Sequence, residues 1–212
     1  MSHACSHDHH HGHDHAPLSA ADSPRYRRVL WAALVINLAM FFVEVLGGWS
    51  SKSVSLLADS VDFFGDAANY GMALAVMGLS LRWRAGSALI KGLSMGAFGL
   101  FVLGRAAWSA WQGGVPEPLT MGVIGALALA ANLGVAVMLY AWREGDANMR
   151  SVWLCTRNDA IGNLVVLAAA LGVFGTHSAW PDLAVAGVMA LLALSAARSV
   201  IQQARQELRK AW

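Results

Sequence analysis

Residues 29–48 read VLWAALVINLAMFFVEVLGG, with Glu44 as the one ionisable side chain among them. A helix of about 20 apolar residues crosses the ~30 Å hydrocarbon core of a bilayer. Five further runs of this kind follow, at roughly 54–80, 88–111, 119–142, 152–174 and 182–203. The sequence therefore predicts an all-α protein, a polytopic bundle of six transmembrane helices.

The composition agrees with this fold class. Of the 212 residues, 57% are hydrophobic and 13% are charged, whereas soluble domains have about 25% charged residues. The two cysteines, Cys5 in a polar tail and Cys155 in an apolar run, do not form a disulfide framework. We expect a His-rich tail over residues 1–24, a six-span transmembrane domain over 25–205 and a short C-terminal segment over 206–212.

The breaks between the runs carry turn or charge signals and place basic residues on one side. The expected breaks are residues 47–50, 82–84, 113–118, 143–150 and 175–181. Basic residues gather before the first run, in or near the second and fourth breaks, and at or beyond the end of the sixth run: Arg25, Arg27, Arg28, Arg82, Arg84, Lys91, Arg143, Arg150, Arg198, Arg205, Arg209 and Lys210. The other side has Lys52 alone. By the positive-inside rule, both termini are expected in the cytoplasm. A long polar segment precedes the first run, so no cleavable signal peptide is expected.

The N-terminal segment MSHACSHDHHHGHDH, residues 1–15, contains seven of the eight histidines. These are His3, His7, His9, His10, His11, His13 and His15. Imidazole binds zinc, copper, nickel and cobalt, and Cys5 adds a thiolate. Expression tags are uninterrupted repeats, whereas this segment is interspersed with other residue types. It therefore favours a flexible tail that captures metal.

Carboxylates occur inside the second apolar run, in LLADSVDFFGDAAN, residues 56–69. Spacings of three and four residues put Asp59, Asp62 and Asp66 on one helical stripe. An Asp at the centre of a membrane helix costs about 2.5–3.5 kcal/mol. A carboxylate kept at that depth indicates a functional site.

The fifth run repeats the arrangement in LCTRNDAIGN, residues 154–163. Two helices that present such pairs can close the four-ligand site that Zn²⁺ prefers. The predicted metal ligands are Asp62, Asp66, Cys155 and Asp159. Two other interpretations stay open at this point: Cys155 is a small residue packed between helices, or the aspartates belong to a structural network with Arg105 or Arg157.

Further polar residues lie within the apolar runs. Asn37 and Glu44, seven residues apart, share one face of the first run. Asp59 and Asn163 flank the predicted ligands along their helices. We expect these four residues to line the ion pathway and not to bind the ion directly.

The stretch SVSLLADSVDFFGDAAN, followed by CTRNDAIGN, resembles the cation diffusion facilitator family of divalent-metal/proton antiporters. In that family the second and fifth spans each carry His or Asp, three residues, then Asp. The resemblance covers residues 25–205 and implies the same ligands, with Cys155 where the family usually has His or Asp. It also implies a homodimer. The family usually adds a cytoplasmic domain after span six, and this sequence stops at Trp212.

These observations predict a secondary transporter that exports Zn²⁺, with Cd²⁺, Co²⁺ or Ni²⁺ as further substrates, in exchange for protons. Asp and Cys must lose protons to bind metal, so metal loading and proton release are linked. A thiolate at position 155 favours Zn²⁺ or Cd²⁺ over Mn²⁺. The sequence contains no nucleophile–base pair and no nucleotide loop, so no enzyme activity, resident cofactor or nucleic-acid partner is expected. The alternatives are a membrane metal sensor or buffer, and a proton-conducting or structural membrane protein.

Overall fold

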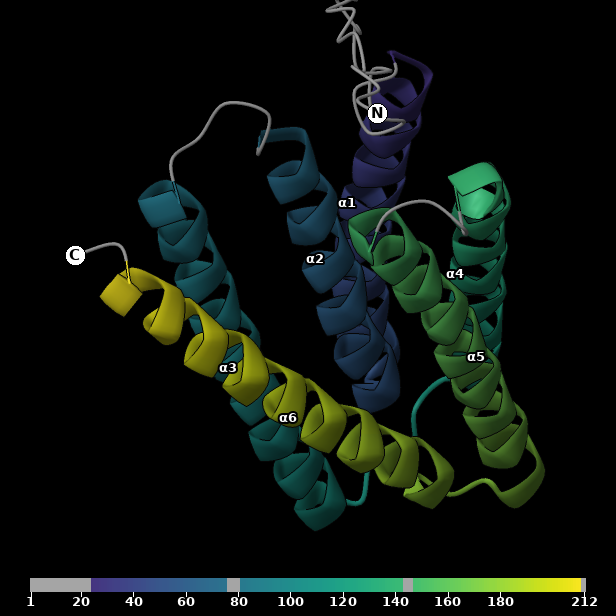
Figure 1. Cartoon of the computed structure of the whole chain (residues 1–212). Coiled ribbons are helices and arrows are strands. Elements are labelled where there is room, and N and C mark those ends of the chain that lie inside the picture. The colour runs from purple at the N-terminus through teal and green to yellow at the C-terminus, as the bar shows by residue number, and fades with distance from the viewer. Residues whose placement is uncertain (1–23, 76–80, 143–146, 211–212) are drawn as a thin grey trace, which may run out of the picture.

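The structure, a computed structural model, describes residues 24–75, 81–142 and 147–210. Six α-helices cover most of these ranges and confirm the predicted all-α bundle (Figure 1). In chain order they are α1 (Pro24–Ser51), α2 (Val54–Ala75), α3 (Leu81–Gln112), α4 (Pro118–Leu139), α5 (Ala147–Thr176) and α6 (Trp180–Lys210), with a 3-10 turn, η2 (Tyr140–Trp142), after α4.

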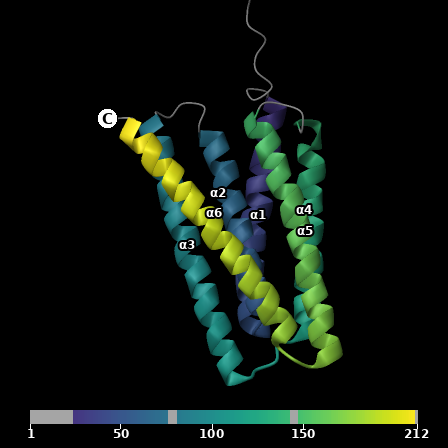
Figure 2. The same cartoon turned by 60° about the horizontal axis from the view of Figure 1, so that its bottom comes forward.

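Five of the helices, α1, α3, α4, α5 and α6, are long and apolar enough to cross a membrane. Helix α2 falls outside this group because it carries three aspartates in its 22 residues. The N-terminal end of α1 and the C-terminal end of α6 lie at the same end of the bundle (Figure 2). This arrangement is the one that six successive crossings require.

Two of the predicted breaks are wrong. Residues 47–50 lie inside α1, and the chain turns later, at Lys52, whose φ is 57°. Gly47 and Gly48 serve close packing, because a Cβ on Gly47 would collide with Ile124 and one on Gly48 would lie 2.9 Å from Leu57 Cγ. Residues 82–84 lie in the first turn of α3, since arginine is a good helix former and does not end a helix.

The break after α3 is confirmed, and its sequence explains it. Gly113 adopts a φ of 69°, the left-handed conformation that ends many helices. Glu117 then caps α4, because its carboxylate accepts hydrogen bonds from the backbone N–H groups of Leu119 and Thr120 at 3.0 and 2.6 Å. The bonds from Thr120, and then that from Leu119, hold the pKa of Glu117 below its ordinary value.

The helices pack as pairs around α2. The most extensive contacts join α3 with α6, α1 with α2, and α4 with α5. Helix α6 crosses the bundle diagonally, from the end of α5 to the side of α3 (Figures 1 and 2). Helix α2 contacts α1, α3, α5 and α6, so its side chains are enclosed by neighbours from both sides of the bundle.

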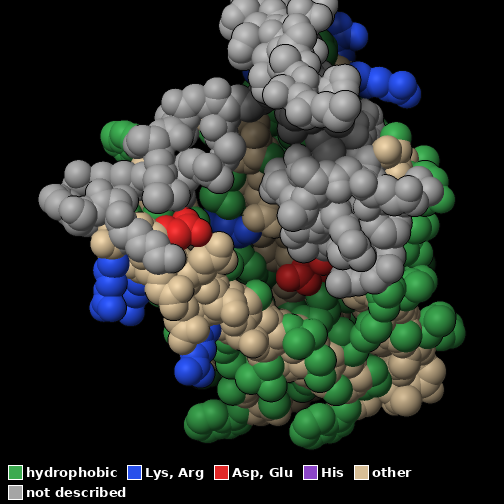
Figure 3. Space-filling model, viewed as in Figure 1, with side chains coloured by type: hydrophobic (Ala, Val, Ile, Leu, Met, Phe, Trp, Pro, Cys, Tyr) green, Lys and Arg blue, Asp and Glu red, His purple; other side chains and the backbone are tan. Residues whose placement is uncertain are grey.

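Polarity is distributed as expected for a protein surrounded by lipid. Hydrophobic side chains point outward; Val137 and Leu171 are 75% and 73% exposed. Figure 3 shows such side chains over the lower part of one face. Glu44, Asp59 and Asn163, in contrast, are fully buried or nearly so. The bundle therefore encloses a polar interior in an apolar shell.

The start of α2 is held by a buried aspartate of α6. Asp182 is fully buried, and its carboxylate accepts hydrogen bonds from Ser53 Oγ (2.7 Å), the Val54 N–H (2.8 Å), the Ser55 N–H (3.1 Å) and Ser55 Oγ (2.6 Å). It thus satisfies backbone donors that a helix N-terminus leaves free. The anchor fixes the position of α2, and with it the aspartates further along that helix.

Replacement of Asp182 by Ala should leave four buried donors without an acceptor and lower the stability of the bundle by about 1–3 kcal/mol. Asp182→Asn keeps one carbonyl oxygen and should lose less. The measurement is the midpoint of denaturant-induced unfolding in detergent micelles. Equal midpoints for Asp182→Ala and the wild type would contradict the anchoring role.

Candidate metal site

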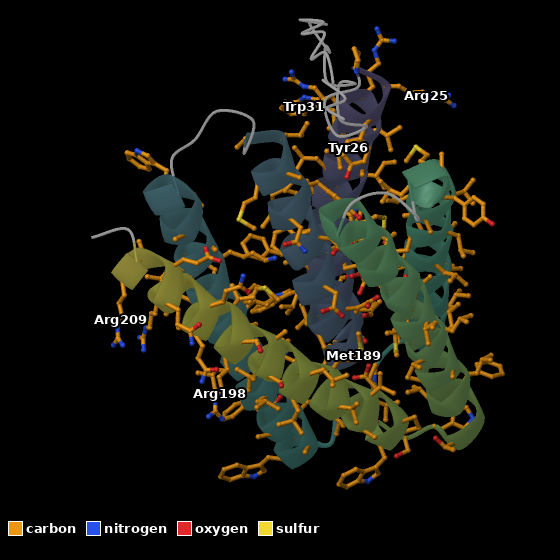
Figure 4. The ribbon with its side chains drawn as sticks, in the orientation of Figure 1. Arg25, Tyr26, Trp31, Met189, Arg198 and Arg209 are labelled. Atoms are coloured by element: carbon orange, nitrogen blue, oxygen red, sulfur yellow. The ribbon has the colours of Figure 1, made fainter. Side chains whose placement is uncertain are left out.

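The predicted site residues of α2 face the interior of the bundle. Asp59 and Asp66 are 1% and 6% exposed, and Asp62 between them is half-buried. Figure 4 shows oxygen-tipped side chains gathered between α2 and α5, whereas the labelled Arg25, Arg198 and Arg209 point away from that region. The structure therefore places the acidic stripe of α2 opposite α5, the helix that carries the second predicted motif.

One group of contacts forms around Asp66. Its carboxyl group interacts electrostatically with that of Asp159, from α5. Tyr70 donates a hydrogen bond from its hydroxyl to Asp66 Oδ2 at 3.0 Å, and that hydroxyl lies 2.6 Å from Thr156 Oγ1. Two carboxylates are both acceptors, so such a contact requires a proton or a cation between them. This pair joins α2 to α5.

A basic residue of α3 lies close to this group. Lys91 is 9% exposed, and its ammonium donates a hydrogen bond to Asn69 Oδ1 on α2. The same ammonium attracts the Asp66 carboxylate. Lys91 therefore brings a positive charge to one side of the acidic stripe.

A second group of contacts forms around Asp59. Asn163 Nδ2 donates to Asp59 Oδ2 at 2.6 Å, and Asn132 Nδ2 donates to Asn163 Oδ1 at 2.9 Å. Glu44, from α1, interacts electrostatically with Asp59. Asn37 instead donates to the carbonyl of Ala33 in its own helix, at 2.8 Å. Four helices thus contribute to a polar cluster around Asp59.

Asp62 lies on α2 between these two groups and interacts electrostatically with Asp59, Asp66 and Asp159. In the part of the chain that the structure describes, no three or more histidine, cysteine or acidic side chains stand together as a metal site. The structure brings Asp66 close to Asp159, but Asp62 does not join these two residues to form a closed set of ligands. The four-ligand arrangement therefore stays a prediction.

Several predicted residues lie outside the described part of the structure. The backbone of Cys155 belongs to α5, but its side chain and that of Arg157 are not described. All seven tail histidines lie within residues 1–23, which are also outside the described ranges. Arg105, one of the two arginines considered as ion-pair partners, lies with its guanidinium over the ring of Trp49, 5.3 Å from the centroid.

The sequence analysis missed three residues that shape this interior. Asn132 is the one amide in the otherwise apolar helix α4, so the sequence alone could have identified it as part of the polar interior. Tyr70 lies one helical turn after Asp66 and was therefore on the same face. The contact between Tyr70 and Thr156 depends on how α2 meets α5, which no local pattern shows.

Residues 30–209 match the family described as the cation efflux transmembrane domain. The chain belongs to the cation efflux family. This membership confirms the resemblance inferred from the aspartate motifs, and it identifies the bundle as a multi-pass membrane protein.

Relatives from this cation efflux family are similar over most of the chain. The metal cation efflux system protein CzcD of Cupriavidus metallidurans is 25% identical over 196 residues, 87% of this chain and 60% of CzcD. The cadmium, cobalt and zinc/H(+)-K(+) antiporter of Bacillus velezensis is 24% identical over 87% of this chain and 61% of its own length. Zinc transporter ZitB of Escherichia coli is 24% identical over 93% of this chain and 67% of ZitB. The chain thus spans about three-fifths of the length of CzcD.

The contact between Tyr70, Asp66 and Thr156 can be tested by a double-mutant cycle. Tyr70→Phe and Thr156→Val should each lower the unfolding free energy by about 1 kcal/mol, because each removes one partner of a buried hydrogen bond. The double variant should lose clearly less than the sum of the two, since both substitutions break the same bond. Strictly additive losses, measured by unfolding in detergent, would show that the two hydroxyls do not interact.

Proposed function

We propose that this protein exports divalent transition-metal cations, with Zn²⁺ as the main substrate, from the cytoplasm in exchange for protons. The single observation that carries the proposal is the electrostatic interaction of the buried Asp66 with Asp159, which links α2 to α5 inside an apolar bundle. Family membership supports it, as do the names of the relatives CzcD and ZitB.

The ion would bind between α2 and α5. Asp62, Asp66 and Asp159 offer carboxylate oxygens, and Cys155, four residues before Asp159 on α5, offers a thiolate. Three hard oxygens and one soft sulfur form a four-coordinate set that suits Zn²⁺ and tolerates Cd²⁺. Closure of this set needs Asp62 to approach the pair formed by Asp66 and Asp159, a movement of side chains and helices that the ion itself would favour.

Protons follow from the same ligands. The Asp66–Asp159 contact needs a proton when no metal is bound, because two facing carboxylates repel each other. A divalent cation replaces that proton on binding, and protonation of the ligands promotes its release. If the site opens alternately to each side of the membrane, metal and protons cross in opposite directions.

The proposed orientation in the membrane is based on exposed arginines at the ends of α1 and α6. Arg25, Arg27 and Arg28 are exposed at the start of α1, and Arg205 and Arg209 are exposed near the end of α6. These two ends lie at the same end of the bundle (Figure 2), and by the positive-inside rule that end faces the cytoplasm.

Other features of the proposal follow from the sequence. The His-rich tail, residues 1–24, would capture cytoplasmic metal and deliver it to the transport domain, residues 25–205, and residues 206–212 would lie on the cytoplasmic side. The protein would act as a homodimer in the lipid bilayer, as a transporter and not as an enzyme. A membrane sensor or buffer would bind the same metals and move none.

Asp66→Ala tests the site. It should abolish Zn²⁺ transport and leave membrane insertion intact, because removal of a buried carboxylate lowers the cost of insertion. The assay is Zn²⁺ uptake by proteoliposomes across a pH gradient, with Glu207→Ala, at the far end of α6, as the matched control. Wild-type flux in Asp66→Ala would remove Asp66 from the site, and wild-type protein that binds zinc without moving it would indicate a sensor.

The two interpretations of Cys155, ligand or packing residue, predict opposite orders of transport activity for Cys155→His and Cys155→Ser. If its thiolate binds the ion, Cys155→His should preserve transport and shift preference away from Cd²⁺, whereas Cys155→Ser should weaken binding because a neutral hydroxyl is a poor ligand. If Cys155 only packs between helices, the smaller change to Ser should be mild and the larger His harmful. Zn²⁺ and Cd²⁺ uptake by inverted vesicles separates the two. Wild-type behaviour of Cys155→Ser would exclude it as a ligand.

The His-rich tail should affect the capture of metal from the cytoplasm and not the transport step across the membrane. Deletion of residues 1–15 should lower uptake at scarce metal and leave the maximal rate nearly unchanged, since the tail raises the local metal concentration only. Uptake measured over a range of Zn²⁺ concentrations tests this. Loss of activity at saturating Zn²⁺ would place the tail in the transport mechanism itself.

A further inference from the structure

Glu44 is the most unusual buried group in the described part of the chain. Its side chain is 0% exposed, and neither of its carboxyl oxygens receives a hydrogen bond from any described residue. It interacts electrostatically with Asp59, which is 1% exposed. A buried charge without a partner costs several kcal/mol. Two facing carboxylates in this position need a proton or a cation between them.

The hydrogen bonds around the pair favour a proton over a metal ion. Asn132 donates to Asn163, and Asn163 in turn donates its N–H to Asp59 Oδ2 at 2.6 Å. Amides that coordinate a cation present their carbonyl oxygen, whereas Asn163 presents a donor to the pair. The donated bond favours the ionised form of Asp59. Glu44 therefore carries the proton of the pair, and its hydroxyl group can donate a hydrogen bond to Asp59.

The charged groups around the pair lead to the same conclusion. Asp62, on α2, and Asp159, on α5, act on the pair from the side of the metal site, and both add negative charge. Helix α4 contributes Asn132 and has no charged residue between Pro118 and Leu139. Neighbouring negative charge makes a doubly ionised pair still less favourable, so one proton is retained.

The pair lies one helical turn before Asp62, the nearest proposed ligand, and nearer to one membrane face. Asp59 is five residues after Val54, the first residue of α2, which corresponds to about 8 Å along the helix. Asp66 lies about 10 Å further along. In the proposed orientation the start of α2 faces away from the cytoplasm. The pair thus lies between the metal ligands and the face on which the ion is released.

We propose that Glu44 and Asp59 form a separate proton-binding site, which takes up a second proton in exchange for the metal ion, in addition to the proton that Asp66 and Asp159 hold. This inference rests on the proposed antiport. The Glu44 carboxylate binds one proton from the release side as the metal leaves. It gives that proton up on the cytoplasmic side when the next ion arrives and the bundle reopens. Asn132 and Asn163 are positioning residues that keep Asp59 ionised as the acceptor.

The test compares Glu44→Gln with Glu207→Gln, which makes the same change on α6, far from the pair along the chain. Infrared difference spectra of the full chain should show a protonated carboxyl band that Glu44→Gln lacks and Glu207→Gln retains. In proteoliposomes, Glu44→Gln should bind Zn²⁺ within about threefold of wild type. Its ratio of protons to Zn²⁺ transported should fall to about half that of the wild type, and its Zn²⁺ flux should rise less steeply with the pH gradient.

The remaining outcomes separate the inference from the proposed function. Loss of Zn²⁺ binding in Glu44→Gln, as expected for Asp66→Ala, would assign the pair to the metal site and overturn the inference. An unchanged ratio of protons to Zn²⁺ transported would overturn it as well. If the wild type moves no Zn²⁺, the proposed antiport fails, and the carboxyl band alone then decides whether the pair holds a proton. Should Glu44→Gln not fold, Asp59→Asn removes the acceptor and should cause the same fall in this ratio.

Discussion

The constraint on which this structure depends is that the carboxylates of α2 cannot face lipid. Three aspartates on one helix of 22 residues are tolerated at membrane depth only inside a bundle that supplies partners for them. Helices α1, α3, α5 and α6 accordingly surround α2. Helix α4 is linked to it indirectly, because Asn132 binds Asn163 on α5, which in turn binds Asp59. The polar interior is the reason for the arrangement of the helices and not a by-product of it.

The same constraint explains why the position of α2 is fixed so firmly at one end. Asp182 binds the first turn of α2 with four hydrogen bonds, and Gly48 lets α1 approach Leu57 closely. The opposite half of α2 is held by Tyr70, which links Asp66 to Thr156 on α5. The proposed transport requires both properties, because a fixed end would define the distances between ligands while neighbouring helices rearrange around the ion.

The sequence predicted the six helices and the acidic stripe well, since both depend on local patterns that a membrane enforces. It failed at the breaks near Gly47 and Arg82, where glycines serve helix packing and arginines continue a helix. It could not show that Glu44 meets Asp59 or that Tyr70 meets Thr156, because these contacts depend on how helices face each other. The sequence could not show the contacts of Asp182 either, because its partners lie more than 120 residues away along the chain.

The central claim is that a divalent cation binds to the carboxylates of α2 and α5 inside the bundle. Zinc K-edge X-ray absorption tests it most directly, on the full chain with the seven tail histidines replaced by asparagine and one Zn²⁺ bound per protein. The account predicts oxygen ligands at about 2.0–2.2 Å and one sulfur at about 2.3 Å. A shell of nitrogen ligands, or no bound zinc once the tail histidines are gone, would contradict it.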